Sequence, residues 1–326
     1  MSPGHIPATG SIPRVPANKL YEMGRYYRDY ADFLADRFPG RKMQKLTVDA
    51  GFSCPNRDGS LSRGGCSYCN NSSFSPMTDG SGRTHLSVTE QIARGRDFFG
   101  RKYPDMGYLA YFQSYTNTHG ELDRLLALYD EALAAPGVEG LVIGTRPDCL
   151  PEPLLDALAE RRCKGAQIMI ELGAESSHDE TLRRVNRCHT WTCVEDAVAR
   201  LRQREIPVGL HLIMGLPGES REMMLETVRR AAALDPATVK FHQLQIIEGS
   251  ALARHYATDS SCVSLFTPEE YLDLCVGIVG LMNLLAPETA IDRFTSSAPA
   301  DLLVAPRWGL KNYQFVNLLH RRLAGM

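Results

Sequence analysis

The alternation of short apolar runs with segments of helical period is the feature that most constrains the fold of this chain. Six runs predict strands, at Lys45–Asp49, Tyr108–Phe112, Gly140–Gly144, Gln167–Leu172, Val208–Met214 and Thr238–Ile246. Helices are expected in the intervening segments, at Val88–Lys102, Gly120–Ala134, Pro153–Cys163, Asp179–Val185 with Thr192–Arg204, and Ser220–Leu234. Because neighbouring parallel strands need crossover helices, the pattern predicts an α/β fold with a parallel sheet, either a barrel or a part-barrel.

Length and composition indicate an ordinary globular protein. The chain has 326 residues, of which 44% are hydrophobic and 23% charged, so it can bury one large core. Its formal net charge of −2 provides no overall attraction to nucleic acid. The longest apolar stretch, Leu272–Ala286, contains Asp273 and Asn283 and predicts a packed helix rather than a membrane span. We expect no membrane partner and a cytoplasmic location.

No linker rich in Pro, Gly or Ser separates the strand–helix repeats into two domains. Residues 1–17, with four prolines, are expected to form a disordered tail. Residues 18–41 are expected to form a helical extension, because Leu20, Met23, Tyr27, Ala31 and Leu34 recur at helical spacing. Residues 42–300 would then form the barrel core, and 301–326 a basic tail packed on or near it.

Three cysteines lie in one glycine-rich loop after the first predicted strand. Cys54, Cys66 and Cys69 have the spacing C-x11-C-x2-C. A structural zinc site or a closed iron–sulfur cluster ordinarily takes four protein ligands, so three thiolates leave one coordination position open. Open positions are typical of catalytic metal centres.

Spacing alone leaves the identity of the metal undecided. An iron–sulfur cluster and a zinc ion, completed by a distant His or by Cys149, suit these thiolates equally well. A disulfide framework is disfavoured, because the nine cysteines are an odd number and the chain starts without an apolar signal segment.

Polar motifs recur where the predicted strands end. After the second to sixth strands they are Gln113–Thr116, Thr145–Cys149, Glu171–Ser176, Gly215–Glu219 and the group His242, Gln243, Gln245 and Glu248. In parallel barrels the chemistry collects at the carboxyl ends of the strands, so these motifs and the cysteine loop predict one shared site.

The combined motifs resemble a known family. The segments C-P-N-R-D-G-S-L-S-R-G-G-C-S-Y-C, Y-F-Q-S-Y-T-N-T, G-T-R-P-D-C-L, E-L-G-A-E-S-S, V-N-R and H-L-I-M-G-L-P-G-E are similar to those of YhcC-like radical SAM proteins. This branch of the superfamily contains the catalytic subunit of Elongator and the methylthiotransferases. The resemblance runs from Lys42 to Tyr313. It implies a partial (β/α)6 TIM-type barrel of radical SAM type.

The resemblance also implies the cofactors and the catalytic residues. Cys54, Cys66 and Cys69 would hold a [4Fe-4S] cluster whose open iron chelates S-adenosylmethionine (SAM). One electron, from a flavodoxin- or ferredoxin-type donor, would cleave SAM and yield a 5′-deoxyadenosyl radical that abstracts hydrogen from the substrate.

Contacts to SAM can be carried over by position. Gln113 and Ser114 replace the usual G-G-E motif that holds the amino group, so this contact departs from the superfamily pattern. Glu171 and Glu175 would meet the ribose, and Arg187 the carboxylate. The remaining expected contacts are to the adenine, from Tyr68, Gly215 and Gly218.

Substrate-side residues are predicted at two places. The superfamily spacing is C-x3-C-x2-C, so this chain has a longer first gap, whose Asn56, Arg57, Asp58 and Arg63 either reach a substrate or brace the loop. The other candidates follow the strands, and they are Arg146, Asp148, His242 and Gln245. For His242, a hydrogen-bonded core histidine is the competing interpretation.

Basic and aromatic residues at both ends of the chain favour transfer RNA as the substrate. The basic residues are Arg25, Arg28, Arg41, Lys42 and Lys45 at one end and Arg307, Lys311, Arg321 and Arg322 at the other. An unpaired base would stack on Tyr115 or Trp308. Wobble-uridine carboxymethylaminomethyl maturation is the specific reaction considered. The alternatives are a radical SAM enzyme acting on a small metabolite or peptide, and a zinc-stabilised, non-catalytic RNA-binding protein.

Overall fold

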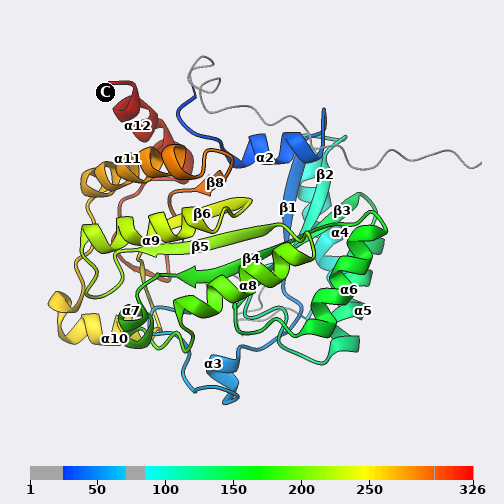
Figure 1. Ribbon diagram of the computed structural model, residues 1–326, viewed down its shortest axis with the longest axis horizontal. Coiled ribbons are helices and arrows are strands. Elements are labelled where there is room, and N and C mark those ends of the chain that lie inside the picture. Colours follow the sequence, from blue (N-terminus) through cyan, green and yellow to red (C-terminus); the bar gives the residue numbers. More distant parts are fainter. Residues whose placement is uncertain (1–24, 71–84, 297, 326) are drawn as a thin grey trace, which may run out of the picture.

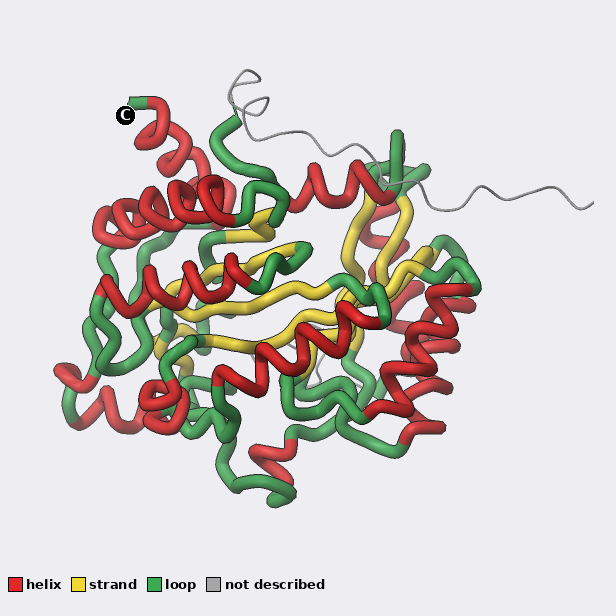
Figure 2. Tube along the Cα trace, in the orientation of Figure 1, coloured by secondary structure: helices red, strands yellow, loops and turns green. Residues whose placement is uncertain are grey.

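The computed structural model describes residues 25–70, 85–296 and 298–325. Seven strands form one parallel sheet in the order β1-β2-β3-β4-β5-β6-β8 (Figures 1 and 2). They are β1 (Met43–Val48), β2 (Gly107–Phe112), β3 (Val138–Thr145), β4 (Gln167–Glu175), β5 (Val208–Met214), β6 (Thr238–Gln243) and β8 (Ala290–Arg293). The first and last strands do not pair, so the curled sheet is an open half-barrel, as expected for a partial TIM-type barrel.

Helices cover the outer face of the half-barrel (Figure 1). These are α4 (Val88–Gly100), α5 (Leu122–Ala134), α6 (Glu152–Cys163), α8 (Trp191–Gln203), α9 (Arg221–Ala233) and α11 (Pro268–Leu285). Local sequence fixes where they begin. Ser87 and Glu90 form a capping box at the start of α4, and Thr267 and Glu270 form one at α11. None of the helices in the described ranges is long and apolar enough to cross a membrane.

Shorter elements complete the fold at its ends. They are α3 (Pro55–Asp58), α7 (Asp179–Arg184), α10 (Ala251–Thr258), a 3₁₀ turn (Ser260–Cys262), α12 (Asn312–Ala324) and the antiparallel pair β7 (Ile246–Ile247) and β9 (Leu303–Ala305). The main core lies between the sheet and the outer helices, where side chains such as Leu141, Ile170 and Phe241 are buried.

A helix fills the gap between the two edge strands. The segment before α2 (Tyr30–Arg37) runs beside β8, where Asp29 bridges Ile291, and α2 then packs Phe33, Leu34 and Phe38 against the inner face of the sheet. Figure 1 shows α2 lying between β8 and β1. It therefore closes the half-barrel at the amino ends of the strands and leaves the carboxyl ends open for a site.

All six predicted strands are present, and the predicted helix at Leu272–Ala286 is α11. Three differences have local causes. The run Thr238–Ile246 is split into β6 and β7. The seventh strand, β8, was not predicted, because its four residues include Asp292 and Arg293. The helix expected over residues 18–41 begins at Tyr30 in the structure, so Tyr27 precedes it. Leu20, Met23 and residues 1–17 lie outside the described ranges.

Candidate functional site

The main cavity lies inside the half-barrel, at the carboxyl ends of the strands, and has a volume of about 180 Å³. It brings together half of the predicted site, namely Cys66, Cys69, Tyr68, Gln113, Glu171, Glu175, Arg187, Arg146 and His242. The other predicted residues do not line it, and these are Cys54, Ser114, Gly215, Gly218, Asn56, Arg57, Asp148 and Gln245.

The cysteine loop is folded on itself beside this cavity. Cys54 precedes the single turn of α3, and Gly59 leaves that turn with a positive φ of 97°. Asp58 accepts hydrogen bonds from Ser53, Ser60 and His119, and these contacts hold the pKa of the Asp58 carboxyl well below its usual range. The inserted residues therefore give the loop a defined shape.

Asn56 and Arg57 brace the same loop from within. The amide of Asn56, which is fully buried, donates to the carbonyl of Asn186 at 2.5 Å and to the sulfur of Cys66 at 3.5 Å. Arg57 donates to the carbonyl of Cys69 at 2.6 Å. A Cβ atom on Gly65 would come within 2.7 Å of Arg57, so glycine is needed there. The Asn56 amide nitrogen and the Arg57 guanidinium therefore brace the loop, whereas the side-chain oxygen of Asn56 is buried without a hydrogen-bond partner.

The cysteine side chains fit a metal-containing group, because metal binding displaces the protons of thiols. Burial, followed by the neighbouring Cys66, raises the pKa of the Cys69 thiol to about 11, so its proton would be displaced by a bound cation rather than lost to water. Within the described ranges, no three His, Cys, Asp or Glu side chains could hold a single metal ion. A cubane cluster places its cysteine ligands on different irons.

Arg187 connects the cysteine loop to β4. Its guanidinium donates to the sulfur of Cys66 at 3.6 Å, to the carbonyl of Gly173 at 2.5 Å and to Nε2 of His189 at 3.0 Å, and lies 3.4 Å from a carboxylate oxygen of Glu175. Burial and then Arg187 lower the pKa of His189 to about 3, so its neutral ring accepts this hydrogen bond. The donors of Arg187 thus point at protein groups. Its contact with a SAM carboxylate stays a prediction.

Glu175 is held in an unusual backbone conformation. Its φ is +67°, and the pairing of β4 with β5 shifts register between Gly173 and Glu175. This irregularity brings the Glu175 carboxylate to Arg187. Burial raises the pKa of Glu175, and the positive charge of Arg187 opposes that rise.

Glu171 lies in a buried ion cluster, which consists of Lys45, Glu171, Lys240 and Asp292. The two carboxylate oxygens of Glu171 accept from Lys45 at 2.8 Å and Lys240 at 2.9 Å, and His211 adds a contact of 2.7 Å. Burial opposes ionisation of Glu171, but the two lysines hold its pKa well below the usual range. Both oxygens of Glu171, which was expected to contact ribose, are therefore already engaged.

Asp148, Ser114 and Gln245 are predicted residues that do not line the main cavity. Asp148 forms a two-point ion pair with Arg146, with distances of 2.9 and 2.7 Å. Ser114 is buried. Gln245 lies with His242 and Tyr68 around a second cavity of about 40 Å³, and its amide donates to the carbonyl of Ser296.

The two predicted glycines have local structural reasons for lacking a side chain. Both have positive φ, 88° at Gly215 and 84° at Gly218. A Cβ atom at Gly215 would come within 2.9 Å of Phe266, and one at Gly218 within 1.5 Å of Arg184. The positive φ favours glycine at both positions, and at Gly215 the aromatic ring of Phe266 also limits the space for a side chain.

Sequence reasoning missed four residues that line the main cavity: Tyr111, His211, Ile213 and Arg293. The first three lie inside predicted strands, where the period of two puts every second side chain on the inner face. That signal was available in the sequence. Arg293 belongs to β8, the strand that was not predicted.

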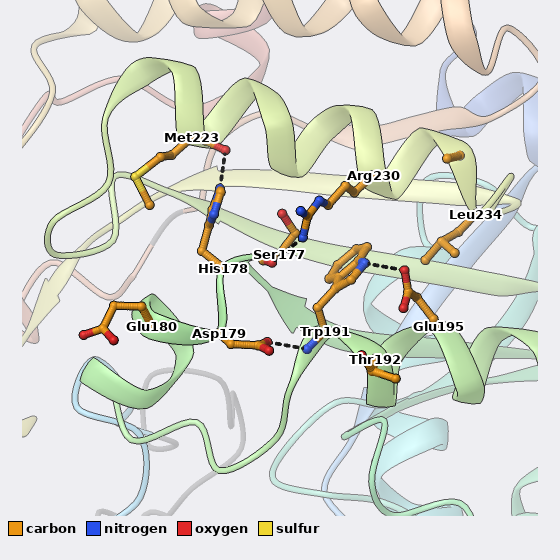
Figure 3. A pocket seen from close by; sticks show the side chains of 11 residues that line it. Ser177, His178, Asp179, Glu180, Trp191, Thr192, Glu195, Met223, Arg230 and Leu234 are labelled. Atoms are coloured by element: carbon orange, nitrogen blue, oxygen red, sulfur yellow. Dashed lines mark hydrogen bonds between the residues drawn. The ribbon is translucent and has the colours of Figure 1, made fainter.

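A separate groove of about 630 Å³ lies outside the half-barrel, between α7, α8 and α9 (Figure 3). Figure 3 shows His178 directed at the carbonyl of Met223 and the indole of Trp191 at Glu195. None of the predicted site residues lines this groove, so the main cavity is the site to which the sequence motifs refer.

Comparison with known proteins shows the family to which this chain belongs. Residues 59–231 match the Radical SAM superfamily, and residues 236–324 match the Radical_SAM C-terminal domain. The chain is 38% identical over 269 residues to Protein YhcC of Escherichia coli strain K12. The aligned region covers 82% of this chain and 83% of YhcC. The chain therefore belongs to the YhcC-like family of the Radical SAM superfamily, whose members bind a [4Fe-4S] cluster and SAM.

Two more distant similarities concern transfer RNA and the fold. A tRNA uridine(34) acetyltransferase of Dehalococcoides mccartyi is 27% identical over 176 residues, 53% of this chain and 36% of that protein. The solved structure of archaeal Elp3 from Methanocaldococcus infernus superimposes with a TM-score of 0.62 at 16% identity, covering 87% of this chain and 63% of that one. The Elp3 likeness supports the half-barrel fold.

Proposed function

We propose that this chain is a radical SAM enzyme that modifies transfer RNA, with Cys54, Cys66 and Cys69 as the ligands of its [4Fe-4S] cluster. The observation that supports the ligand assignment is the folded cysteine loop, which presents Cys66 and Cys69 to a cavity that also contains Arg187 and Glu175. When bound, the cluster and SAM supply a radical able to abstract hydrogen from an unactivated position.

The residues of the chain would position the reactants and exclude water. Asn56 and Arg187 donate hydrogen bonds to the sulfur of Cys66 and so hold this side chain in position. Arg57 fixes the backbone at Cys69. α2 closes the other end of the half-barrel, so substrate would enter from the carboxyl ends of the strands.

Two observations support transfer RNA as the substrate. The first is the similarity to a tRNA uridine(34) acetyltransferase, which supports uridine 34 as the proposed target. Carboxymethylaminomethyl maturation of this uridine is the specific reaction that we propose. The second is the packing of the two basic ends of the chain against each other, because the rings of Tyr26 and His320 lie 5.5 Å apart. Tyr115, which lines the main cavity, is the proposed stacking residue.

Trp308, the other predicted stacking residue, is engaged inside the protein. Its ring stacks on Phe315 with centroids 6.0 Å apart, and its indole donates to the carbonyl of Phe266 at 2.9 Å. Tyr115 lines the main cavity, and this position makes it the proposed residue for base stacking.

Nucleoside mass spectrometry of total transfer RNA, from cells with and without this gene, tests the proposal. Loss of one modified uridine and accumulation of its precursor would support it. Identical nucleoside profiles, with normal SAM cleavage by the purified protein, would favour a small metabolite or peptide as the substrate. A colourless, zinc-loaded protein after anaerobic preparation would favour the non-catalytic alternative.

A further inference from the structure

Three arginines line the main cavity, and two of them have carboxylate partners. Arg146 pairs with Asp148 at 2.7 Å, and Arg187 lies 3.4 Å from Glu175. Arg293 is the third. Its Nε atom is buried without a hydrogen-bond partner, and no carboxylate in the described ranges forms an ion pair with it.

A bulge in β8 turns Arg293 into the cavity. Val239 of β6 pairs with Ile291, but the next residue, Lys240, pairs with Arg293, so Asp292 is an extra residue on β8. Asp292 contacts Lys45 and Lys240, while Arg293 lines the main cavity. Two consecutive side chains therefore face the interior of the half-barrel. Bulges re-aim side chains in this way, often beside active sites.

The surroundings of Arg293 do not neutralise its charge. Burial and then nearby cations lower the pKa of His211 to about 4 and that of His242 to about 3, so both rings are neutral at physiological pH. The neighbouring carboxylates of Glu171 and Asp292 already form ion pairs with Lys45 and Lys240. Burying a guanidinium, even partly, costs free energy when no negative charge lies beside it. A bound anionic ligand would supply that negative charge.

We propose that Arg293 binds an anionic oxygen group of the substrate, a carboxylate or a phosphate, inside the half-barrel. The planar guanidinium offers paired donors to either group. Arg187, which contacts the cysteine loop, is the arginine expected to meet the SAM carboxylate, so we assign Arg293 to the substrate. The inference rests on the proposed function, since it names the substrate chemistry of the same cavity.

Anion binding can be tested without knowing the substrate. The Nε–H resonance of Arg293 would be assigned in ¹H–¹⁵N spectra of the intact protein by its loss in Arg293→Gln, or in Arg293→Lys if the first variant does not fold. Sodium acetate and inorganic phosphate would then be titrated against sodium chloride at equal ionic strength. A saturable shift with acetate would indicate a carboxylate, and a tighter one with phosphate would indicate a phosphate. Absence of a specific shift with both anions would overturn the proposal.

Turnover of transfer RNA gives the second readout. Loss of a charge-assisted contact should raise the KM of Arg293→Gln for its substrate by about 10- to 100-fold, while iron content and SAM affinity stay normal. Arg293→Lys should recover part of the loss. Arg101→Gln, on the exposed end of α4, is the matched control and should behave like wild type.

The two proposals fail in different ways. A wild-type protein that modifies no transfer RNA, but whose Arg293 resonance still responds to acetate or phosphate, would contradict the proposed function and retain the anion site. An Arg293→Gln variant that loses SAM affinity to the same extent as substrate affinity would overturn the assignment of Arg293 to the substrate.

Discussion

Arg187 donates a hydrogen bond from Nη1 to the sulfur of Cys66, over a distance of 3.6 Å. The same guanidinium lies beside the buried carboxylate of Glu175. One side chain therefore links the proposed cluster ligand to the end of β4. Its removal should affect the cluster, the cofactor and the fold together.

We expect Arg187→Ala to lower the free energy of unfolding by about 3–5 kcal/mol, the usual cost of leaving one partner of a buried ion pair uncompensated. SAM affinity should fall by about 1.5–3 kcal/mol if the guanidinium also meets the SAM carboxylate. Urea unfolding and titration calorimetry of the reconstituted protein measure the two effects.

Two further variants separate the causes. Arg187→Ala combined with Glu175→Gln should recover part of the lost stability, because the unpaired carboxylate is gone. Arg183→Ala, which breaks an exposed pair with Glu180 on α7, should change stability by less than about 1 kcal/mol. Unchanged SAM affinity in Arg187→Ala would assign this arginine to the fold and the cluster alone.

The three cysteines of the loop should be equally necessary for the cluster. Replacing Cys54, Cys66 or Cys69 by Ala should abolish the brown chromophore and reductive SAM cleavage, because each thiolate would hold a different iron. Iron and sulfide analysis after anaerobic reconstitution measures this. Cys163→Ala, at the exposed end of α6, is the control. Normal 5′-deoxyadenosine formation by any of the three variants would contradict the ligand assignment.

Sequence patterns predicted the half-barrel well, because strand–helix alternation is a local signal that survives folding. The same patterns located the site at the carboxyl ends of the strands, and nine of its predicted residues meet around the main cavity. The pairing of these residues could not be predicted. Glu171 joins Lys45 and Lys240 across 126 and 69 residues of sequence, and only the curvature of the sheet brings them together.

Arg293 shows a second limit. Its orientation depends on a one-residue bulge in a four-residue strand, and neither the strand nor the bulge has a hydrophobic pattern that would reveal it. Gly218 shows a third, because the sequence led us to expect the adenine of SAM at this glycine and could not reveal the protein group that lies there. In the structure that group is Arg184, whose guanidinium donates to the carbonyl of Pro217 at 2.9 Å.

Stability should fall on acidification because His211 is buried as a neutral ring. Its pKa is lowered to about 4 by burial and by Lys240, from an ordinary value of 6.5. The unfolded chain therefore binds a proton that the folded chain does not, and folding stability decreases as pH falls from about 6.5 to about 4. The difference corresponds to about 3 kcal/mol for this residue.

Urea unfolding at pH 7 and pH 5 measures this effect. His211→Gln removes the titrating group and keeps a donor for Glu171, so its stability should depend less on pH over this range. His255→Gln, at an exposed position on α10, should retain the wild-type dependence. An identical pH dependence in His211→Gln and wild type would show that His211 is not responsible.

The buried ion cluster should be far more sensitive to substitution than ion pairs on the surface. Glu171→Ala leaves Lys45 and Lys240 close together without their shared carboxylate, and we expect a loss of about 3–5 kcal/mol of unfolding free energy. Glu160→Ala breaks an exposed pair with Lys164 and should cost less than about 1 kcal/mol. Similar losses in the two variants would mean that the cluster contributes little beyond surface electrostatics.

Only some of the basic residues that the sequence suggested should contribute to the salt dependence of transfer RNA binding. Arg28 is buried and Lys45 is partly buried, and both have carboxylate partners. Arg25, Arg41 and Arg322 pair with acidic side chains on the surface. Of the nine basic residues that the sequence suggested, four are exposed and form no ion pair in the described ranges, and these are Lys42, Arg307, Lys311 and Arg321.

Position favours two of these four. Asn312, next to Lys311 at the start of α12, accepts a hydrogen bond from Thr295, which follows the carboxyl end of β8. Lys311 therefore lies on the same side of the half-barrel as the main cavity, and Arg307 is four residues before it. Arg321 lies at the other end of α12, next to His320, whose ring contacts Tyr26.

Four phosphate contacts would make the logarithm of the binding constant fall by about 3 per tenfold increase in salt, at roughly 0.7–0.9 for each contact. Fluorescence anisotropy with labelled transfer RNA, measured between low and physiological salt, determines this slope. Combining Arg307→Gln with Lys311→Gln should reduce the slope by about 1.5, whereas Arg229→Gln, on the outer helix α9, should leave it unchanged. A slope near zero in the wild type would mean that phosphate contacts contribute nothing, and the small-molecule alternative would then be preferred.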